Sequence, residues 1–212
     1  TGGTFQRRNG GNGVEGTIGQ TGNHGITAPD VLVYIKKFTR EPNSTSSGHS
    51  DQASLPDIDL RGQAGGQGQR GQRGGDGGDG AKGRKAIDGN FGDCRSGPGY
   101  GGHGGNGGDG GDGGQGGIGG NGGHIVIHHV RVPADTNLQA ADLLTCGGAA
   151  GPGGAGGLGG GAGQGGEAGS RSGNCSPRPG RRGENGQAGA AGQTGPPGVA
   201  GANGSATFQQ MA

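Results

Sequence analysis

Four aspartates stand at regular spacing in two glycine-rich stretches, and their side chains are the ones best suited to bind a cation. Asp76 and Asp79 lie in the run GGDGGD, and Asp109 and Asp112 lie in a second run of the same form. Ca²⁺ takes carboxylate oxygens as ligands, so one interpretation is a cation or glycan site where the four carboxylates approach one another. The other interpretation, which we favour because no EF-hand spacing accompanies the aspartates, is a solvated polar face.

Other side chains that could do chemistry do not form a catalytic pattern. The sequence contains no nucleophile elbow, no Walker lysine, no HExxH and no paired CxxC. His124, His128 and His129 suggest zinc by composition, but on a strand His128 and His129 point to opposite faces, which favours solvated or hydrogen-bonding histidines. We therefore predict that the protein is not an enzyme and needs no cofactor.

Composition excludes several classes of partner. The chain of 212 residues contains 65 glycines, only 25% hydrophobic residues and a net charge of +1. That charge favours neither nucleic acid nor a membrane surface. The longest apolar runs are far shorter than the ~20 residues that span a bilayer. We expect no nucleic-acid partner and no membrane insertion.

The elements that must position these residues are five glycine tracts. Glycine recurs every third residue in tracts one to five, which are residues 10–25, 62–83, 101–124, 148–169 and 180–204. A period of three is that of the polyproline II helix, in which a glycine edge allows close approach of a neighbour. Tract three repeats Gly-Gly-X throughout, so its two glycine edges predict the most enclosed position.

These tracts predict one domain over residues 1–212 that is neither α nor β. We expect a bundle of about five antiparallel polyproline II helices, with a small β-like cap from the long connections 26–61 and 123–147. Those connections contain the β-branched runs VLVYIKKF and HIVIHHVRV, which are typical of strands. We expect the two runs to lie at the same end and to pair or pack together.

The connections also predict a disulfide. A tract of about 22 residues spans roughly 70 Å, whereas the connection 84–100 reaches at most about 60 Å and 170–179 about 35 Å. Neither can return to its starting end, so both connections should lie at one end of the bundle. They contain Cys94 and Cys175, which we predict to be bonded, leaving Cys146 free, buried or in an intermolecular bond. The alternative is three unpaired cysteines that act as small hydrophobes.

Tracts four and five present small residues at every third position. A flat, weakly apolar face of this kind suits ordered water at ice or a neighbouring subunit, and inner packing against other tracts is the alternative. The face consists of Ala149 and Ala155 in tract four and of Ala188, Ala191, Thr194, Pro197 and Ala200 in tract five.

The ends and loops carry further candidates. The chain begins at Thr1 without methionine or a signal peptide, so we expect a processed segment. Phe5 and Phe208 lie in terminal segments that we expect to dock and to mediate head-to-tail assembly. Asn43, in the sequon Asn43-Ser44-Thr45, is the best glycan candidate. Three cysteines in a hydrophobe-poor chain favour an extracellular location.

The GGXGGX tracts joined by turns, with cysteines near the turns, resemble the springtail (snow-flea) antifreeze proteins and the glycine-rich tip adhesin of T-even-type phage long tail fibres. This resemblance implies a bundle of antiparallel polyproline II helices with glycine edges inside. Tract five, with GRRGENGQAGAAGQTGPPGVAGANGSA, is also similar to collagen.

Three functions follow as expectations. The first is a non-enzymatic extracellular structural protein, a rigid rod that self-assembles head-to-tail as a filament subunit or presents adhesive loops to a surface receptor. The second is an antifreeze protein that binds ice through the small-residue face of tracts four and five. The third is a collagen-like trimer.

Overall fold

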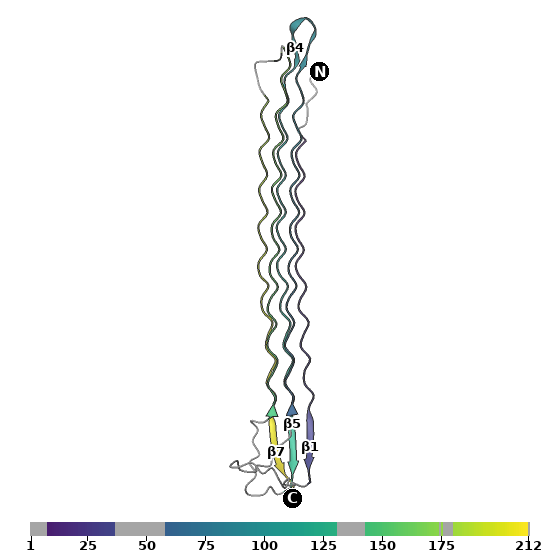
Figure 1. Cartoon of the computed structure of the whole chain (residues 1–212), viewed down its shortest axis with the longest axis vertical. Helices are drawn as coiled ribbons and strands as arrows, with labels where there is room; N and C mark the ends of the chain where they lie inside the picture. Colours follow the sequence, from purple (N-terminus) through teal and green to yellow (C-terminus); the bar gives the residue numbers. More distant parts are fainter. Residues whose placement is uncertain (1–7, 37–57, 131–142, 174, 176–179, 212) are drawn as a thin grey trace, which may run out of the picture. The chain divides into compact units, whose positions relative to one another are not determined.

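A computed structural model describes residues 8–36, 58–130, 143–173, 175 and 180–211 (Figure 1). The chain divides into two compact units, each assembled from three stretches of sequence. Unit 1 contains Thr1–Gln20, Gln69–Gly114 and Gly154–Gly195, and unit 2 contains Thr21–Gly68, Gln115–Gly153 and Pro196–Ala212. Every glycine tract contributes residues to both units. The single-domain organisation expected from the sequence stays a prediction.

Within unit 1, backbone hydrogen bonds join neighbouring tracts once every three residues. Gly10 donates its N–H to the carbonyl oxygen of His103 at 2.8 Å, and Gly13 donates to that of Asn106 at 2.7 Å. Donor and acceptor numbers rise together, so tracts one and three run in the same direction. Tracts two and four pair in the same sense, and so do tracts three and five.

Other tract pairs in unit 1 run in opposite directions. Gly102 donates to the carbonyl oxygen of Ala81, and Gly105 donates to that of Gly78, both at 2.8 Å. Here the donor number rises while the acceptor number falls. The same tract pairs are bonded within unit 2. Ordering glycine costs more conformational entropy than ordering any other residue. Dense backbone hydrogen bonding within each unit offsets that cost.

The predicted fold class is wrong. We expected neither α nor β structure, and a bundle of antiparallel polyproline II helices. The described residues instead include seven β-strands in three sheets, and the tracts are assigned no regular element. The argument from connection length constrains only tracts that follow one another in the sequence. Alternate tracts escape that constraint, and they pair in the same direction.

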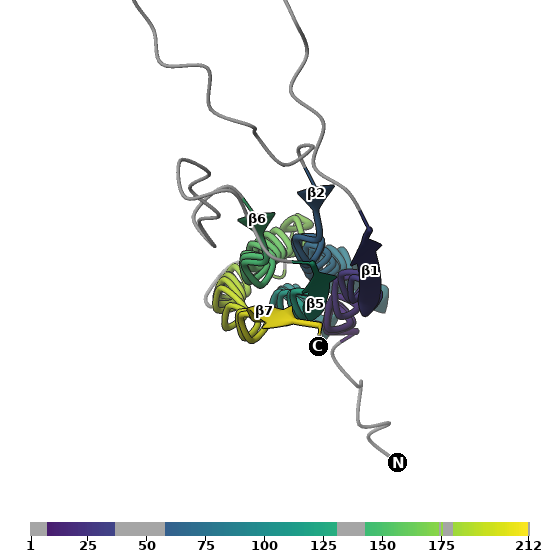
Figure 2. The ribbon, with the colours of Figure 1, turned by 90° about the horizontal axis from the view of Figure 1, so that it is seen from below.

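Unit 2 contains a parallel sheet in which strands continue three of the tracts. β1 (Val31–Ile35), β5 (Ile125–His129) and β7 (Ala206–Gln210) lie side by side in the order β1-β5-β7 (Figures 1 and 2). Both strand pairs are parallel. β1 and β5 are rich in β-branched residues, which suit a pleated, half-buried surface. The two β-branched runs therefore do pair, and β7 joins them from the C-terminal segment.

The small apolar core of unit 2 lies under this sheet. The two-residue strands β2 (Ile58–Asp59) and β6 (Leu143–Leu144) form a second parallel pair. The buried cluster consists of Leu60, Ile125, Ile127 and Leu143, against which alternate residues of β1 and β7 pack. The period of two along β5 places Ile125, Ile127 and His129 on the buried face.

Unit 1 contains a short hairpin formed by β3 (Ile87–Asp88) and β4 (Cys94–Ser96). A 3₁₀ turn, η1 (Asn90–Gly92), connects them, and the backbone of Phe91 is left-handed at φ 63° and ψ 28°. Gly92 also has a positive φ, 88°. Positive φ at both central residues is the geometry of a type I′ turn, which prefers Asn-Gly. Phenylalanine at the first of these positions is strained, because its Cβ crowds the backbone.

Replacing Phe91 by asparagine is therefore expected to stabilise the hairpin by about 1 kcal/mol, since asparagine tolerates the left-handed region. Calorimetry should give a higher unfolding midpoint for Phe91→Asn than for the wild type. Phe91→Ala is the matched control: alanine, like phenylalanine, lacks the short polar side chain that hydrogen-bonds locally in the left-handed region, so it should leave the midpoint close to that of the wild type. A lower midpoint for Phe91→Asn would contradict the turn assignment.

Candidate functional site

The four candidate cation ligands are hydrogen-bonded to backbone N–H groups of two different tracts. Asp76 Oδ1 accepts the N–H of Gly161 at 2.6 Å, and Asp79 Oδ1 accepts that of Gln164 at 2.7 Å. Asp109 and Asp112 accept the N–H groups of Ala190 and Gln193, each at 2.7 Å. The first pair therefore bonds tract four and the second bonds tract five. Among the described residues, no group of three His, Cys, Asp or Glu side chains is arranged to hold a metal ion.

These aspartates belong to a wider ladder in which short polar side chains join neighbouring tracts, most of them parallel and one pair, tracts four and five, antiparallel. Each side chain accepts a backbone N–H of a neighbouring tract and so supplies an acceptor that the backbone does not provide there. Further members that accept a backbone N–H in this way are Asn9, Asn12, Thr27, Asp30, His103, Asn106, Asn121, Asn185 and Asn203. The signal was present in the sequence as Asn, Asp, His and Thr at the third position of the three-residue repeat.

One interruption of the ladder is matched across tracts. Side chains of tract three accept from residues 81 positions later in tract five, as Asn106 does from Gln187. By that offset Gln115 lies opposite Pro196, which has no N–H to donate. The absence of a donor at one tract thus coincides with the absence of an aspartate or asparagine on the other.

The carboxylate of Asp76 is also paired with a cation. Arg73 Nη2 lies 2.6 Å from Asp76 Oδ1, with both side chains more than half exposed. The hydrogen bond from the backbone of Gly161 and then the charge of Arg73 lower the pKa of Asp76 below its usual 3.8. Both causes favour the ionised form, so the hydrogen bond and ion pair of Asp76 are strongest when its carboxylate is charged.

This lowered pKa predicts an acid-sensitive contribution to stability. A group whose pKa is depressed by folding stabilises the folded state above its usual pKa, and the contribution is lost as pH falls through the folded value. Asp76→Asn keeps an oxygen acceptor for Gly161 but removes the charge. In urea titrations at a series of pH values below about 5, the wild type should lose more stability than Asp76→Asn. Equal slopes would show that the carboxylate charge contributes nothing.

The predicted disulfide between Cys94 and Cys175 is confirmed, with the two Cα atoms 4.8 Å apart. It joins β4 to the connection between tracts four and five, within unit 1. Cys175 is almost fully buried, with 1% exposure. Cys146 is a free, exposed thiol in unit 2. A structural disulfide is compatible with an extracellular protein.

The small-residue face is exposed within each unit. In unit 1, Ala188, Ala191 and Thr194 of tract five are exposed, as is Ala155 of tract four. In unit 2, Pro197, Ala200 and Ala149 are exposed. The alternative interpretation was that these side chains pack inward against other tracts. Within each unit they are exposed instead.

Backbone donors lie beside this row in unit 1. Asn185 Oδ1 accepts the N–H of Gly165 in tract four. Continuing that antiparallel register places Ala188, Ala191 and Thr194 opposite residues 162, 159 and 156. Those three N–H groups have no hydrogen-bond acceptor among the described residues. The side chains of Ala188 and Ala191 have no atom that could accept them.

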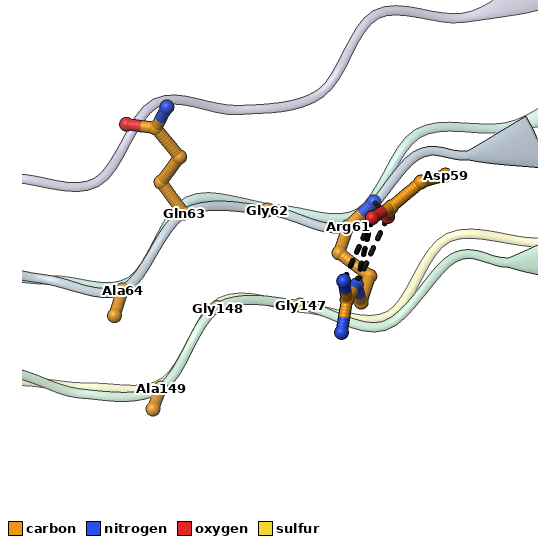
Figure 3. A pocket seen from close by; sticks show the side chains of 8 residues that line it. All are labelled: Asp59, Arg61, Gly62, Gln63, Ala64, Gly147, Gly148 and Ala149. Atoms are coloured by element: carbon orange, nitrogen blue, oxygen red, sulfur yellow. Dashed lines mark hydrogen bonds and ion pairs between the residues drawn. The ribbon is translucent and has the colours of Figure 1, made fainter.

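A surface groove of about 470 Å³ lies in unit 2 between the starts of tracts two and four (Figure 3). Its floor is glycine backbone, and its two charged residues face each other. Arg61 Nη2 donates to Asp59 Oδ2 at 2.7 Å, and Arg61 Nε donates to Asp59 Oδ1 at 2.9 Å. The hydrogen bonds from Arg61 lower the pKa of Asp59. The groove thus contains a self-neutralising pair and no converging set of catalytic groups.

A contact between His124 and Ser205 was missed by the sequence analysis. His124 Nδ1 lies 2.8 Å from Ser205 Oγ. A Ser-His nucleophile also needs a carboxylate on the other ring nitrogen, but Asp30 accepts the backbone N–H of His124 instead. The contact occupies a ladder position between tracts three and five, and we assign it a structural role.

The remaining predicted residues are placed as follows. Phe208 is half-buried and packs against the unit 2 core. Phe5 and Asn43 lie outside the described residues. Within the described part of the chain, no helix is long and apolar enough to cross a bilayer.

Comparison with known proteins gives little. No protein-family model matches the chain, and no curated protein matches it. Among solved structures, the chain is 22% identical to a springtail antifreeze protein from Granisotoma rainieri, described as a nine polyproline type II helical bundle whose crystal waters match the ice lattice. The match covers 84% of this chain and 92% of that one, with a TM-score of 0.11. A score this low does not establish a common fold, and no conclusion rests on it.

Proposed function

We propose that this protein is a non-enzymatic extracellular structural module that self-associates head-to-tail. The observation that carries the proposal is the parallel sheet of unit 2, in which β1 and β7 each pair with β5 and, among the described residues, with no other strand, so that each has an open edge there. An open edge offers unpaired N–H and C=O groups to another chain. The residue types best suited to chemistry are, by contrast, largely engaged in holding the tracts together.

The register identifies which residues present the open edges. Val31 donates its N–H to His124, and Met211 donates to His129, so odd-numbered residues of both outer strands face β5. Because a strand alternates with a period of two, Leu32 and Tyr34 direct their backbone groups outward from β1. Gln210 does the same at the edge of β7.

The two edges are different surfaces, and they complement each other in direction. β1 of a second copy could pair in parallel with β7. The sheet would then continue in the order β1-β5-β7-β1, with all strands running in the same direction. A contact between two different patches is heterologous and continues as an open assembly unless rotation closes a ring. The expected product is a filament or a large ring, not a symmetric dimer.

Proline substitutions test this contact. Leu32→Pro and Gln210→Pro each remove one outward N–H while sparing the bonds to β5, and prolines are tolerated on edge strands. Sedimentation velocity over a concentration series should show assembly by the wild type and by the controls Leu32→Ala and Gln210→Ala. The two proline variants should remain monomeric. A wild type that stays monomeric at every concentration, with only dispersed particles in negative stain, would reject self-association.

Ice binding is a second candidate, and one observation favours it. In unit 1 the exposed row Ala188, Ala191 and Thr194 runs beside backbone N–H groups that have no acceptor among the described residues. Small side chains next to regularly spaced donors can order water at a flat surface. The regular spacing follows from the three-residue repeat of the tract.

Ala191→Gln tests the ice candidate, because a long side chain would interrupt the row. Ala190→Gln is the matched control: Ala190 is exposed between Gln187 and Gln193, and its N–H is already bonded to Asp109. Thermal hysteresis should be present in the wild type and in Ala190→Gln and largely lost in Ala191→Gln. Absence of thermal hysteresis in the wild type would end this candidate and leave the structural module untouched.

A further inference from the structure

The tip of the β3–β4 hairpin exposes an aromatic ring completely. Phe91 has a relative exposure of 102%, the highest of any large hydrophobic residue in the described part of the chain. Its backbone is left-handed at φ 63°, where asparagine or glycine would be relaxed. The ring therefore contributes nothing to packing within the protein, and its backbone position is unfavourable. Strain at an exposed position points to a role outside the fold.

Two half-exposed apolar side chains accompany Phe91 in the same connection. Ile87 in β3 has 49% exposure, and Tyr100, after β4, has 50%. Tyrosine with one apolar and one polar end is the side chain that typically lies at a membrane–water interface. The connection 84–100 thus carries a fully exposed ring, a half-exposed aliphatic side chain and a half-exposed amphipathic one.

Basic residues are in excess in the two connections at this end of unit 1. The described residues of 84–100 and 170–182 contain six basic side chains, Arg84, Lys85, Arg95, Arg171, Arg181 and Arg182, and two acidic ones, Asp88 and Asp93. That excess of four positive charges contrasts with the net +1 of the whole chain. Local charge, which the overall value conceals, therefore favours an anionic partner here.

Backbone bonds bring the two connections together and fix the tip. Ala86 donates its N–H to Ser170 at 2.9 Å, and Gly101 donates to Arg181 at 2.9 Å. Gly89 donates to Asp93 at 2.6 Å across the turn. The Cys94–Cys175 disulfide joins the same two connections covalently. Because the loop is already ordered, binding through it costs little conformational entropy.

We propose that this hairpin docks on an anionic lipid bilayer, with Phe91 entering the boundary between headgroups and acyl chains and the arginines and Lys85 contacting the lipid phosphates. A phenyl ring has no hydrogen-bonding group, and Ile87 offers only an aliphatic surface, so apolar contact favours lipid over a soluble acidic polymer. Basic residues near an anionic bilayer each add to binding, and one apolar side chain adds a second contribution. This is surface docking, and it requires no spanning segment.

Vesicle sedimentation with the full chain tests the proposal. The wild type should bind vesicles of equal parts phosphatidylcholine and phosphatidylglycerol and should not bind phosphatidylcholine alone. Phe91→Asn should weaken binding about tenfold or more, the cost of one lost apolar side chain. The double variant Arg95→Gln and Arg171→Gln should weaken it by about fivefold per charge removed, and salt should weaken the wild type similarly.

Controls separate these effects from misfolding. Phe91→Asn is expected to stabilise the turn, so weaker binding by a protein with a higher unfolding midpoint cannot come from loss of the fold. Leu158→Asn removes another exposed apolar residue, with 57% exposure, from tract four and should leave binding unchanged. Unchanged binding by Phe91→Asn overturns the proposal. A wild type that does not bind anionic vesicles also overturns it. Binding to heparin, a soluble acidic polysaccharide, without binding to vesicles would count as the same result.

Discussion

Gly111→Ala is expected to destabilise unit 1 by about 3 kcal/mol or more, because there is no room for a methyl group at the centre of the tracts. Gly111 is buried, and a Cβ built on it would overlap the carbonyl group of Thr17 in tract one. It cannot move away easily. Its N–H donates to Gln72 at 2.9 Å, and its carbonyl accepts from Gly157 at 2.8 Å, so tracts one, two and four all confine it.

Gly11→Ala is the matched control for this substitution. Gly11 lies in tract one of the same unit and is exposed, and a Cβ built there meets nothing within 4 Å. Alanine should leave stability unchanged or raise it by about 0.4–1 kcal/mol, because it restricts the unfolded chain. Urea and thermal unfolding of both variants measure the difference. If Gly111→Ala proved as stable as Gly11→Ala, the close approach of tracts one and three would be wrong.

Removing the disulfide has the largest expected effect. Cys94 and Cys175 are separated by 81 positions in the sequence, and a cross-link over a loop of that length restricts the unfolded chain by about 4.5 kcal/mol. A protein with few apolar residues has little other stabilisation to replace it. The double variant Cys94→Ser and Cys175→Ser should therefore unfold at a much lower urea concentration than the wild type.

Cys146→Ser separates this effect from a general effect of replacing thiols. Cys146 is free and exposed in unit 2, so serine there should leave the urea midpoint unchanged. Reductant should lower the midpoint of the wild type and of Cys146→Ser to that of the double variant. A double variant as stable as the oxidised wild type would mean that the disulfide does not contribute to the fold.

The aspartates illustrate what periodicity alone can and cannot tell. The three-residue spacing correctly places Asp76 and Asp79 on one edge of tract two, and Asp109 and Asp112 on one edge of tract three. Which neighbour's N–H groups face that edge depends on the register between tracts, and the sequence of one tract does not contain it. In the structure, Asp76 and Asp79 accept hydrogen bonds from tract four, whereas Asp109 and Asp112 accept them from tract five.

The sheets show the same limit. The β-branched run at Val31 and that at Ile125 were recognisable as strands, and their pairing followed from their place at tract ends. The C-terminal segment was also strand-like, but its partner was not predicted: ATFQQ becomes β7 because tract five delivers it to β5 in register. The offset of 81 residues that joins Asn106 to Gln187 also joins Ile125 to Ala206. The tracts, not strand propensity, therefore set the order of the sheet.

By itself the sequence determined where glycine is required and which cysteines meet. Both depend on local quantities: glycine at every third residue marks the positions that admit no Cβ, and connection lengths limit how far the chain can travel. Only the tertiary structure decided that alternate tracts pair in parallel, that the carboxylates satisfy backbone donors, and that Phe91 is left bare on a strained turn. Those outcomes depend on which segments become neighbours, because a hydrogen bond or an exposed ring is a relation between distant parts of the chain.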